Sequence, residues 1–154
     1  MLKIKTLILG HHGTPGAASA EQLAFELAEP GTRIVHLLVV PDFWAGMQGD
    51  DWLNNASTRD AFAEHVEKML EREAADQVRA LGERCAERGL DYVSVVRFGD
   101  PAECMIQVAR ETGAELAVLG PRRKKGEAGY RSRMDLEKLT ADLGIPFVVA
   151  ARAQ

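Results

Sequence analysis

The stretch IVHLLVV, residues 34–40, decides the fold of this chain, because only His36 interrupts its run of aliphatic side chains. A nearly continuous apolar run of this length is typical of a strand that lies inside a sheet with both faces covered. Other short apolar runs predict four more strands, at residues 4–9, 92–98, 116–119 and 147–151.

Amphipathic stretches alternate with these strands and predict helices at residues 15–28, 59–88, 101–113 and 135–142. At the start of the third helix we expect Asp100 as the N-cap, Pro101 at the first helical position and Glu103 completing a capping box. Strands that alternate with helices predict an α/β fold. We expect a single doubly wound domain over residues 1–154, with a five-stranded parallel sheet in order 3-2-1-4-5 and helices on both faces.

Composition narrows the class of protein. The chain has 154 residues, 46% of them hydrophobic, which is enough to build a core and excludes a disordered tail or a disulfide-built mini-protein. Its net charge of −4 makes nucleic-acid binding unlikely. The longest purely apolar run, residues 37–41, is too short to cross a membrane, and no secretory signal is recognisable at the N-terminus. We therefore expect a soluble, cytoplasmic protein with no membrane contact.

The two cysteines, Cys85 and Cys104, are expected to be free thiols. In the predicted order, the helices after the first two strands cover one face of the sheet and the later helices cover the other. The two cysteines then lie on opposite faces, farther apart than the roughly 7 Å between Cα atoms that a disulfide tolerates. No Cys-x-x-Cys or His-Glu-x-x-His spacing is present, so we expect no metal site.

The predicted strand order also places a candidate binding site. The winding reverses between the first and fourth strands, and ligands of such sheets bind in the crevice beyond the carboxyl ends of the strands at that point. The sequence brings two segments there, the run Gly10-His11-His12-Gly13-Thr14 and the loop that follows Gly120, and Val40 ends the neighbouring strand.

Several segments, taken together in their order and spacing, give the chain a family resemblance. The first strand closes on Gly13-Thr14, Gly99-Asp100-Pro101 turns into a helix, and Ala114 to Gly120 reads AELAVLG. A final Pro146 precedes the last apolar strand. Over about residues 4–151 the chain resembles the universal stress protein family, which implies the same α/β fold and a role in stress response.

The resemblance also implies a nucleotide site, which this sequence alters. Members that bind ATP carry Asp-Gly after the first strand, where this chain has His12-Gly13. They then carry Gly-x2-Gly-x9-Gly-Ser/Thr, and in the register that starts at Gly120 those positions hold Arg123, Arg133 and Met134. The shifted start at Gly126 places a leucine, not a glycine, at residue 139. Binding of ATP or AMP is possible in this fold, but the usual motif is broken at three places.

The loop of residues 121–133 is strongly basic. Six basic side chains against Glu127 give it a net charge of +5, which leaves −9 on the rest of the chain. One interpretation is a solvated surface segment, and a second is an anion-binding lip over the crevice. A third, a nucleic-acid contact, has little support because Tyr130 is the only aromatic residue among the basic ones. Arginine binds phosphate well, so the second interpretation makes Arg122, Arg123 and Arg133 candidate ligand contacts, together with Gly126 in the same loop.

Other candidate groups have two interpretations each. His11 and His12 either have structural roles or contact a ligand, whereas His36 is expected to be a hydrogen-bonded core histidine. The aromatic and methionine side chains of residues 43–52, among them Trp44 and Trp52, either pack the segment onto the domain or form a lid or partner contact. No catalytic constellation is recognisable.

The function expected from these observations is a non-enzymatic stress-response or regulatory protein that binds a ligand or partner without the usual ATP site. One alternative is a nucleotide-binding protein with slow ATP hydrolysis. Another is an interaction module that regulates a larger system such as a transporter. The last strand, from Phe147 to Ala151, is an uncharged edge, and members of the family it resembles commonly dimerise there, so we expect a homodimer.

Overall fold

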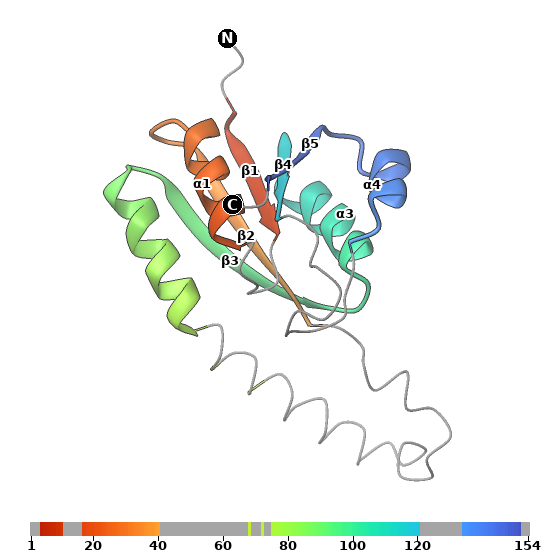
Figure 1. Cartoon of the computed structure of the whole chain (residues 1–154), viewed down its shortest axis with the longest axis horizontal. Helices are drawn as coiled ribbons and strands as arrows, with labels where there is room; N and C mark the ends of the chain where they lie inside the picture. The colour runs from red at the N-terminus through yellow and green to blue at the C-terminus, as the bar shows by residue number, and fades with distance from the viewer. Residues whose placement is uncertain are drawn as a thin grey trace.

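A computed structural model describes residues 4–10, 17–40, 68, 72, 75–120 and 134–151 of the chain (Figure 1). Five strands form one parallel sheet: β1 (Thr6–Gly10), β2 (Arg33–Val40), β3 (Asp91–Phe98), β4 (Leu116–Leu119) and β5 (Phe147–Val149). Their order is β3-β2-β1-β4-β5, which confirms the predicted topology. The register places Gly10, the last residue of β1, between Leu37 of β2 and Leu119 of β4.

Helices cover both faces of this sheet. They are α1 (Ala17–Leu27), a helix over residues 75–87, α3 (Pro101–Thr112) and α4 (Leu136–Asp142). Of the long helix predicted at residues 59–88, the described part is helical at 68, 72 and 75–87, and the remainder lies outside the described residues. The first predicted strand began too early and the last ended too late, since β1 starts at Thr6 and β5 ends at Val149.

The core is divided into two clusters by the sheet. Ile8 and Val35 pack with α3 and α4 on one face, whereas Leu7 and Leu9 pack with α1 and the helix of residues 75–87 on the other. Cys104 belongs to the first cluster and Cys85 to the second, both as free thiols. Their predicted placement on opposite faces is therefore confirmed.

The helix of residues 75–87 is fastened to α1 by charge as well as by apolar packing. Arg84 donates a hydrogen bond to the Glu21 carboxylate at 2.8 Å. The guanidinium groups of Arg84 and Arg88 lie 4.7 and 4.3 Å from the centre of the Phe25 ring. Cation–π contacts of this kind add to the stability that the helix gains by burying its Leu81 and Cys85 side chains.

Capping residues fix where α3 begins and where it ends. Asp100 is its N-cap and accepts a hydrogen bond from the Glu103 amide at 3.0 Å, with Pro101 at the first helical position, as predicted. Gly113 ends the helix in a left-handed conformation with φ 69°, which a glycine adopts without strain. The predicted capping box is wrong in one respect: the Glu103 carboxylate accepts a hydrogen bond from Lys138 of α4, at 2.6 Å, rather than from the Asp100 amide.

His36 is a core histidine, as predicted from its place in an apolar run. Its side chain is completely buried, and Nδ1 lies 2.6 Å from the Tyr92 hydroxyl of β3. Burial raises the pKa of Tyr92 above its ordinary value and raises the pKa of the Cys85 thiol, in the same cluster, from 9.0 to about 11.

Gly10 permits a close approach between α3 and the end of β1. A Cβ atom placed at Gly10 would lie only 2.6 Å from the Met105 Cε atom, which is closer than carbon atoms tolerate without movement. Met105 is completely buried, so its methyl group occupies the space that the glycine leaves. The end of β1 therefore packs closely against α3, with the Met105 thioether of α3 beside Gly10 of β1.

Alkaline pH should weaken this fold through Cys85. A thiol whose pKa is higher in the folded than in the unfolded state contributes stability that is complete below pH 9 and is lost as the pH rises toward 11. We expect Cys85→Ala to lower the free energy of unfolding at pH 7. Above pH 9, the free energy of unfolding of this variant should fall less steeply with pH than that of the wild type, by about 1 kcal/mol per pH unit. Urea unfolding at pH 7, 9 and 11 measures both, and equal pH slopes for the two proteins would contradict the expectation.

Gly10→Ala should destabilise the protein by about 1–3 kcal/mol, because the new methyl group overpacks the Met105 side chain. Gly82→Ala is the matched control, since its Cβ would lie at ordinary contact distance, 3.4 Å, from the Tyr92 ring, and the substitution favours the helix. Met105→Leu lacks the terminal methyl group and should reduce the cost of Gly10→Ala. Thermal unfolding measures all four variants, and costs that simply add in the double variant would refute the proposed contact.

Candidate functional site

The site predicted from the strand order lies where β1 and β4 end side by side. Gly10 pairs with Leu119, and Gly120 follows directly, so two predicted site residues come together at the reversal of the winding. Val40 ends β2 three residues beyond Leu37, the partner of Gly10. The other predicted site residues lie outside the described part of the chain: His11, His12, Gly13, Thr14, Arg122, Arg123, Gly126 and Arg133.

The described surroundings of Gly10 are apolar and mostly buried. Besides the Met105 methyl group, the Leu119 Cδ2 and Met134 Cε atoms lie 3.6 and 3.9 Å from the position of a Cβ atom on Gly10. Met134 is half-buried and packs against the cluster that contains Leu139. Met134 directly precedes the Asp135 N-cap and Leu139 is the fourth residue of α4, which are the positions of a hydrophobic staple. The residue at the hydroxyl position of the family motif thus contributes a methyl group to the apolar surroundings of Gly10.

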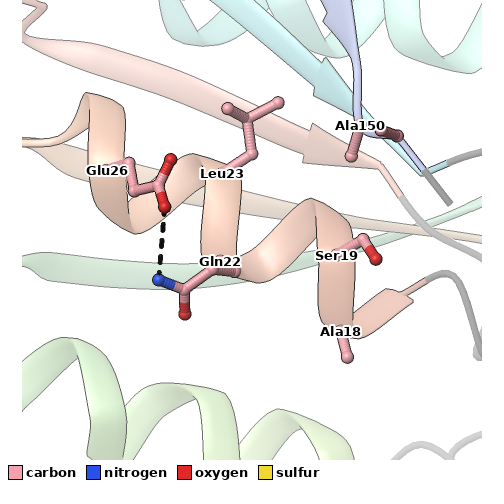
Figure 2. A pocket seen from close by; sticks show the side chains of 7 residues that line it. Ala18, Ser19, Gln22, Leu23, Glu26 and Ala150 are labelled. Carbon is pink, nitrogen blue, oxygen red and sulfur yellow. Dashed lines mark hydrogen bonds between the residues drawn. The ribbon is translucent and has the colours of Figure 1, made fainter. Parts of the chain in front are cut away.

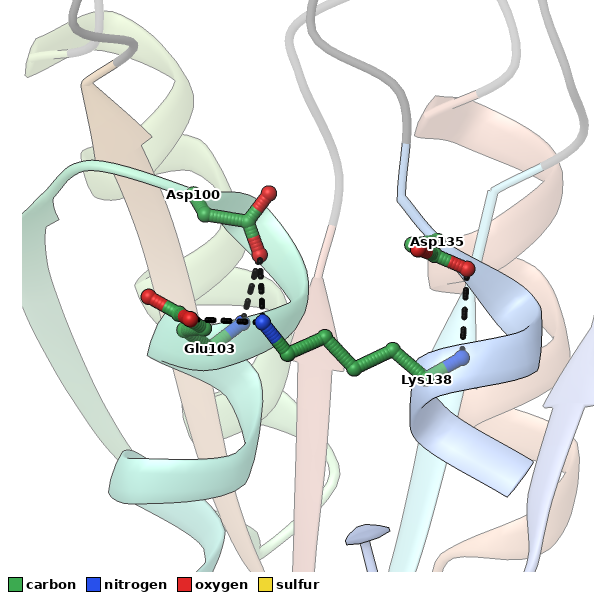
Figure 3. Close-up of polar contacts among 4 residues, drawn as sticks. All are labelled: Asp100, Glu103, Asp135 and Lys138. Atoms are coloured by element: carbon green, nitrogen blue, oxygen red, sulfur yellow. Dashed lines mark hydrogen bonds and ion pairs between the residues drawn. The ribbon is translucent and has the colours of Figure 1, made fainter. Parts of the chain in front are cut away.

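Polar contacts join the first turns of α3 and α4 (Figure 3). Each helix is capped by its own aspartate: Glu103 N donates to Asp100 Oδ2 at 3.0 Å, and Lys138 N donates to Asp135 Oδ1 at 3.1 Å. The Lys138 side chain reaches from α4 to α3, where its Nζ atom lies 2.6 Å from Glu103 and 3.9 Å from Asp100. The hydrogen bond to Glu103 raises the pKa of Lys138, which keeps the ammonium group charged.

The connection between these two first turns was not found from the sequence. Each aspartate could be recognised as an N-cap because it directly precedes an amphipathic run. The link through Lys138 joins residues 35 positions apart, so no local pattern reveals it. The contact of Met105 with Gly10 likewise had no signal in the spacing.

A shallow groove, separate from the predicted site, lies between α1 and residues 150–151, which follow β5 (Figure 2). It is on the face of the sheet that α1 covers, opposite α3 and α4. Its lining is mostly apolar, with one polar edge where Gln22 donates a hydrogen bond to Glu26 at 3.5 Å. The lining residues are Ala18, Ser19, Gln22, Leu23, Glu26, Ala150 and Ala151. None of the predicted site residues contributes to it.

Two kinds of feature were not found among the described residues. Across residues 4–10, 17–40, 75–120 and 134–151, no three acidic, cysteine or histidine side chains converge as metal ligands would. In that same part of the chain, no helix has the length and apolar character needed to span a membrane.

Comparison with solved structures supports the fold. Universal stress protein UspA from Lactobacillus plantarum superposes with a TM-score of 0.73 at 14% identity, covering 98% of this chain and 100% of its own. A universal stress protein family protein from Arabidopsis thaliana, solved with AMP bound, gives 0.62 at 11% identity, covering 97% and 92%. A universal stress protein in complex with cAMP gives 0.58 at 12% identity, covering 97% and 98%.

Comparison of sequences identifies the family. No curated protein matches the chain. The model of the Universal stress protein family matches residues 3–132, which is most of the chain, and confirms the resemblance inferred from the motifs. This chain therefore belongs to the universal stress protein family.

Proposed function

We propose that this protein is a cytoplasmic regulator of the stress response that binds a small anion or mononucleotide at the crevice between β1 and β4, without the family's usual ATP site. The observation that carries the proposal is the Met134 methyl group, 3.9 Å from the Cβ position of Gly10. A thioether cannot donate a hydrogen bond, so it does not replace the hydroxyl group that the ATP-binding motif provides.

The rest of the motif supports weak binding through side chains. Glycines allow backbone N–H groups to approach phosphates, but Arg123 and Arg133 stand at two of the glycine positions. An arginine can bond a phosphate bidentately, at the cost of ordering its side chain. The Arabidopsis relative with AMP bound shows that this fold accommodates a mononucleotide in another member. We extend that property to this chain as part of the proposal.

The binding proposal predicts weak, salt-sensitive affinity for AMP and no tight site for ATP. Calorimetry should show that the double variant Arg123→Ala, Arg133→Ala loses most of this affinity, because hydrogen bonds to charged groups contribute about 1.5–3 kcal/mol each. The double variant Arg33→Ala, Arg79→Ala is a matched control, since it removes the same charge at exposed positions on β2 and on the helix of residues 75–87. Mass spectrometry of molecules released from the purified protein identifies the natural ligand. Tight ATP binding that survives loss of Arg123 and Arg133 would refute the proposal.

We also propose that β5 pairs with its counterpart in a second copy of the chain. β5 lies at one edge of the sheet, and its Val148 and Val149 side chains are 37% and 43% exposed. An uncharged apolar edge with free backbone groups favours pairing with another strand. Two-fold symmetry would close such a contact as a homodimer.

Val149→Lys should shift the protein toward the monomer, because the charge would be placed on the proposed contact. Val93→Lys is the matched control: Val93 is 40% exposed and lies on β3, at the other edge of the sheet. Light scattering coupled to size-exclusion chromatography at micromolar concentration measures both variants. A wild-type protein that is already monomeric under these conditions would refute the dimer.

A further inference from the structure

We infer that β3 is a self-recognition surface, along which two copies of the chain pair in an antiparallel arrangement centred on Ser94. β3 forms the edge of the sheet opposite to β5, and no described residue pairs with its outer side (Figure 1). It offers a strand of 8 residues, whereas β5 has 3. The two edges are separate surfaces, so the inference does not depend on the contact proposed for β5.

The backbone of β3 presents a regular set of hydrogen-bonding groups at this edge. The Asp91 amide donates to the Thr32 carbonyl at 3.0 Å, so the backbone groups of Asp91 point toward β2. Because these groups alternate along a strand, those of Tyr92, Ser94 and Val96 point outward. In the proposed register Ser94 faces its counterpart, and Tyr92 of each copy faces Val96 of the other. Each facing pair then exchanges both of its N–H···O bonds.

The apolar side chains fit the same register. Val95 packs against the cluster on the α3 side of the sheet, and Tyr92 against the cluster on the other side. Val93 would face Val95 of the second copy on the first side, and Val96 would face Tyr92 on the second. In the single chain Val93 is 40% exposed and Val96 is 36% exposed, so pairing would cover both. Facing valines, and a valine facing an aromatic ring, stabilise antiparallel strands.

The charges on β3 are complementary to those of a second β3. With Ser94 on the two-fold axis, Asp91 of each copy faces Arg97 of the other, which gives two reciprocal pairs of opposite charge. The Arg97 guanidinium already lies at this edge, since it donates to the Val96 carbonyl at 3.2 Å. The pattern of charges at both ends and apolar residues between them therefore favours a second copy of this chain as the occupant.

The same charges select one register. A pairing centred on Val95 also keeps facing side chains on one face of the joined sheet. It would place Arg97 opposite Val93, however, and would leave Asp91 opposite a glycine, without an ion pair at either end. The pairing centred on Ser94 is the one that satisfies the backbone, the valines and the charges together.

This contact should be weak. Arg97 donates to the Glu111 carboxylate of α3 at 2.8 Å, so a second copy has to share that guanidinium. A single strand pair also buries less than the roughly 1,200 Å² of a stable interface. We therefore expect half-association at about 0.1–1 mM. At micromolar concentration the contact is dissociated, so Val93→Lys remains a suitable control for β5 there.

Exchange of the charges tests the contact, with Val149→Lys present in every protein to prevent pairing through β5. Asp91→Lys and Arg97→Glu each place like charges opposite one another, and each should weaken self-association about tenfold or more. An equimolar mixture of the two restores both opposite-charge pairs and should associate about as strongly as the parent. Asp142→Lys, on α4, is the matched control and should leave self-association unchanged. Sedimentation equilibrium up to about 1 mM measures all of them.

Disulfide trapping tests the register. Ser94→Cys should form a covalent dimer on mild oxidation, because facing Cα atoms of a hydrogen-bonded pair lie about 5.5 Å apart, within the range of a disulfide. Val95→Cys detects the alternative register, and Val93→Cys is the matched control, since its counterpart lies diagonally across the pair. The native Cys85 and Cys104 are buried free thiols, so non-reducing electrophoresis reports the introduced cysteine.

Three results would each overturn the inference. They are a parent that stays monomeric at about 1 mM, a mixture of the charge variants that associates no better than either alone, and trapping through Val95→Cys in preference to Ser94→Cys. Thermal unfolding checks that each variant is folded. If a charge variant is not, the parent and the trapping experiment decide, because the cysteine substitutions keep both charges.

Discussion

The structure depends on the burial of β1 from Leu7 to Gly10. The side chains of Leu7, Ile8 and Leu9 are inaccessible to solvent, and the strand is hydrogen-bonded to β2 on one side and β4 on the other. Successive side chains enter opposite clusters, so β1 holds together the two halves of the core. A shift of one residue in its register would exchange the two faces, which makes the alignment of every neighbouring strand depend on it. This central strand ends at Gly10, where the winding of the sheet reverses.

Most of this architecture could be predicted because its signals are local. Alternation of apolar runs with amphipathic stretches, together with right-handed crossovers, leaves few strand orders, and the observed order is the one expected. The burial of His36 and the N-cap at Asp100 were likewise apparent from their immediate neighbours. The Glu103 carboxylate was placed wrongly because its partner, Lys138, is distant in sequence and comes close only when α3 and α4 pack together. Local rules describe what a side chain can bond, but tertiary packing decides among the available partners.

The candidate site likewise has a part that the sequence predicts and a part that it does not. Strand order alone placed Gly10 and Gly120 at the crevice, and the spacing of the family motif drew attention to Met134. The sequence did not reveal that the methyl groups of Met105 and Met134 converge on Gly10, because a helical or motif spacing says nothing about where a flexible side chain ends. The contact between the first turns of α3 and α4 shows a related limit, since the Lys138 ammonium of α4 meets Asp100 and Glu103 only when the two helices pack together.

The self-capped first turns of α3 and α4 have a consequence for how ligand binding and folding are coupled. A protein that relies on a bound anion to complete its helix termini gains stability from that anion and loses it when the anion is depleted. Here both termini are completed by side chains of the same chain, so the first turns of α3 and α4 need no bound anion to form. Depletion of anions from the solution should therefore leave these two helix termini intact.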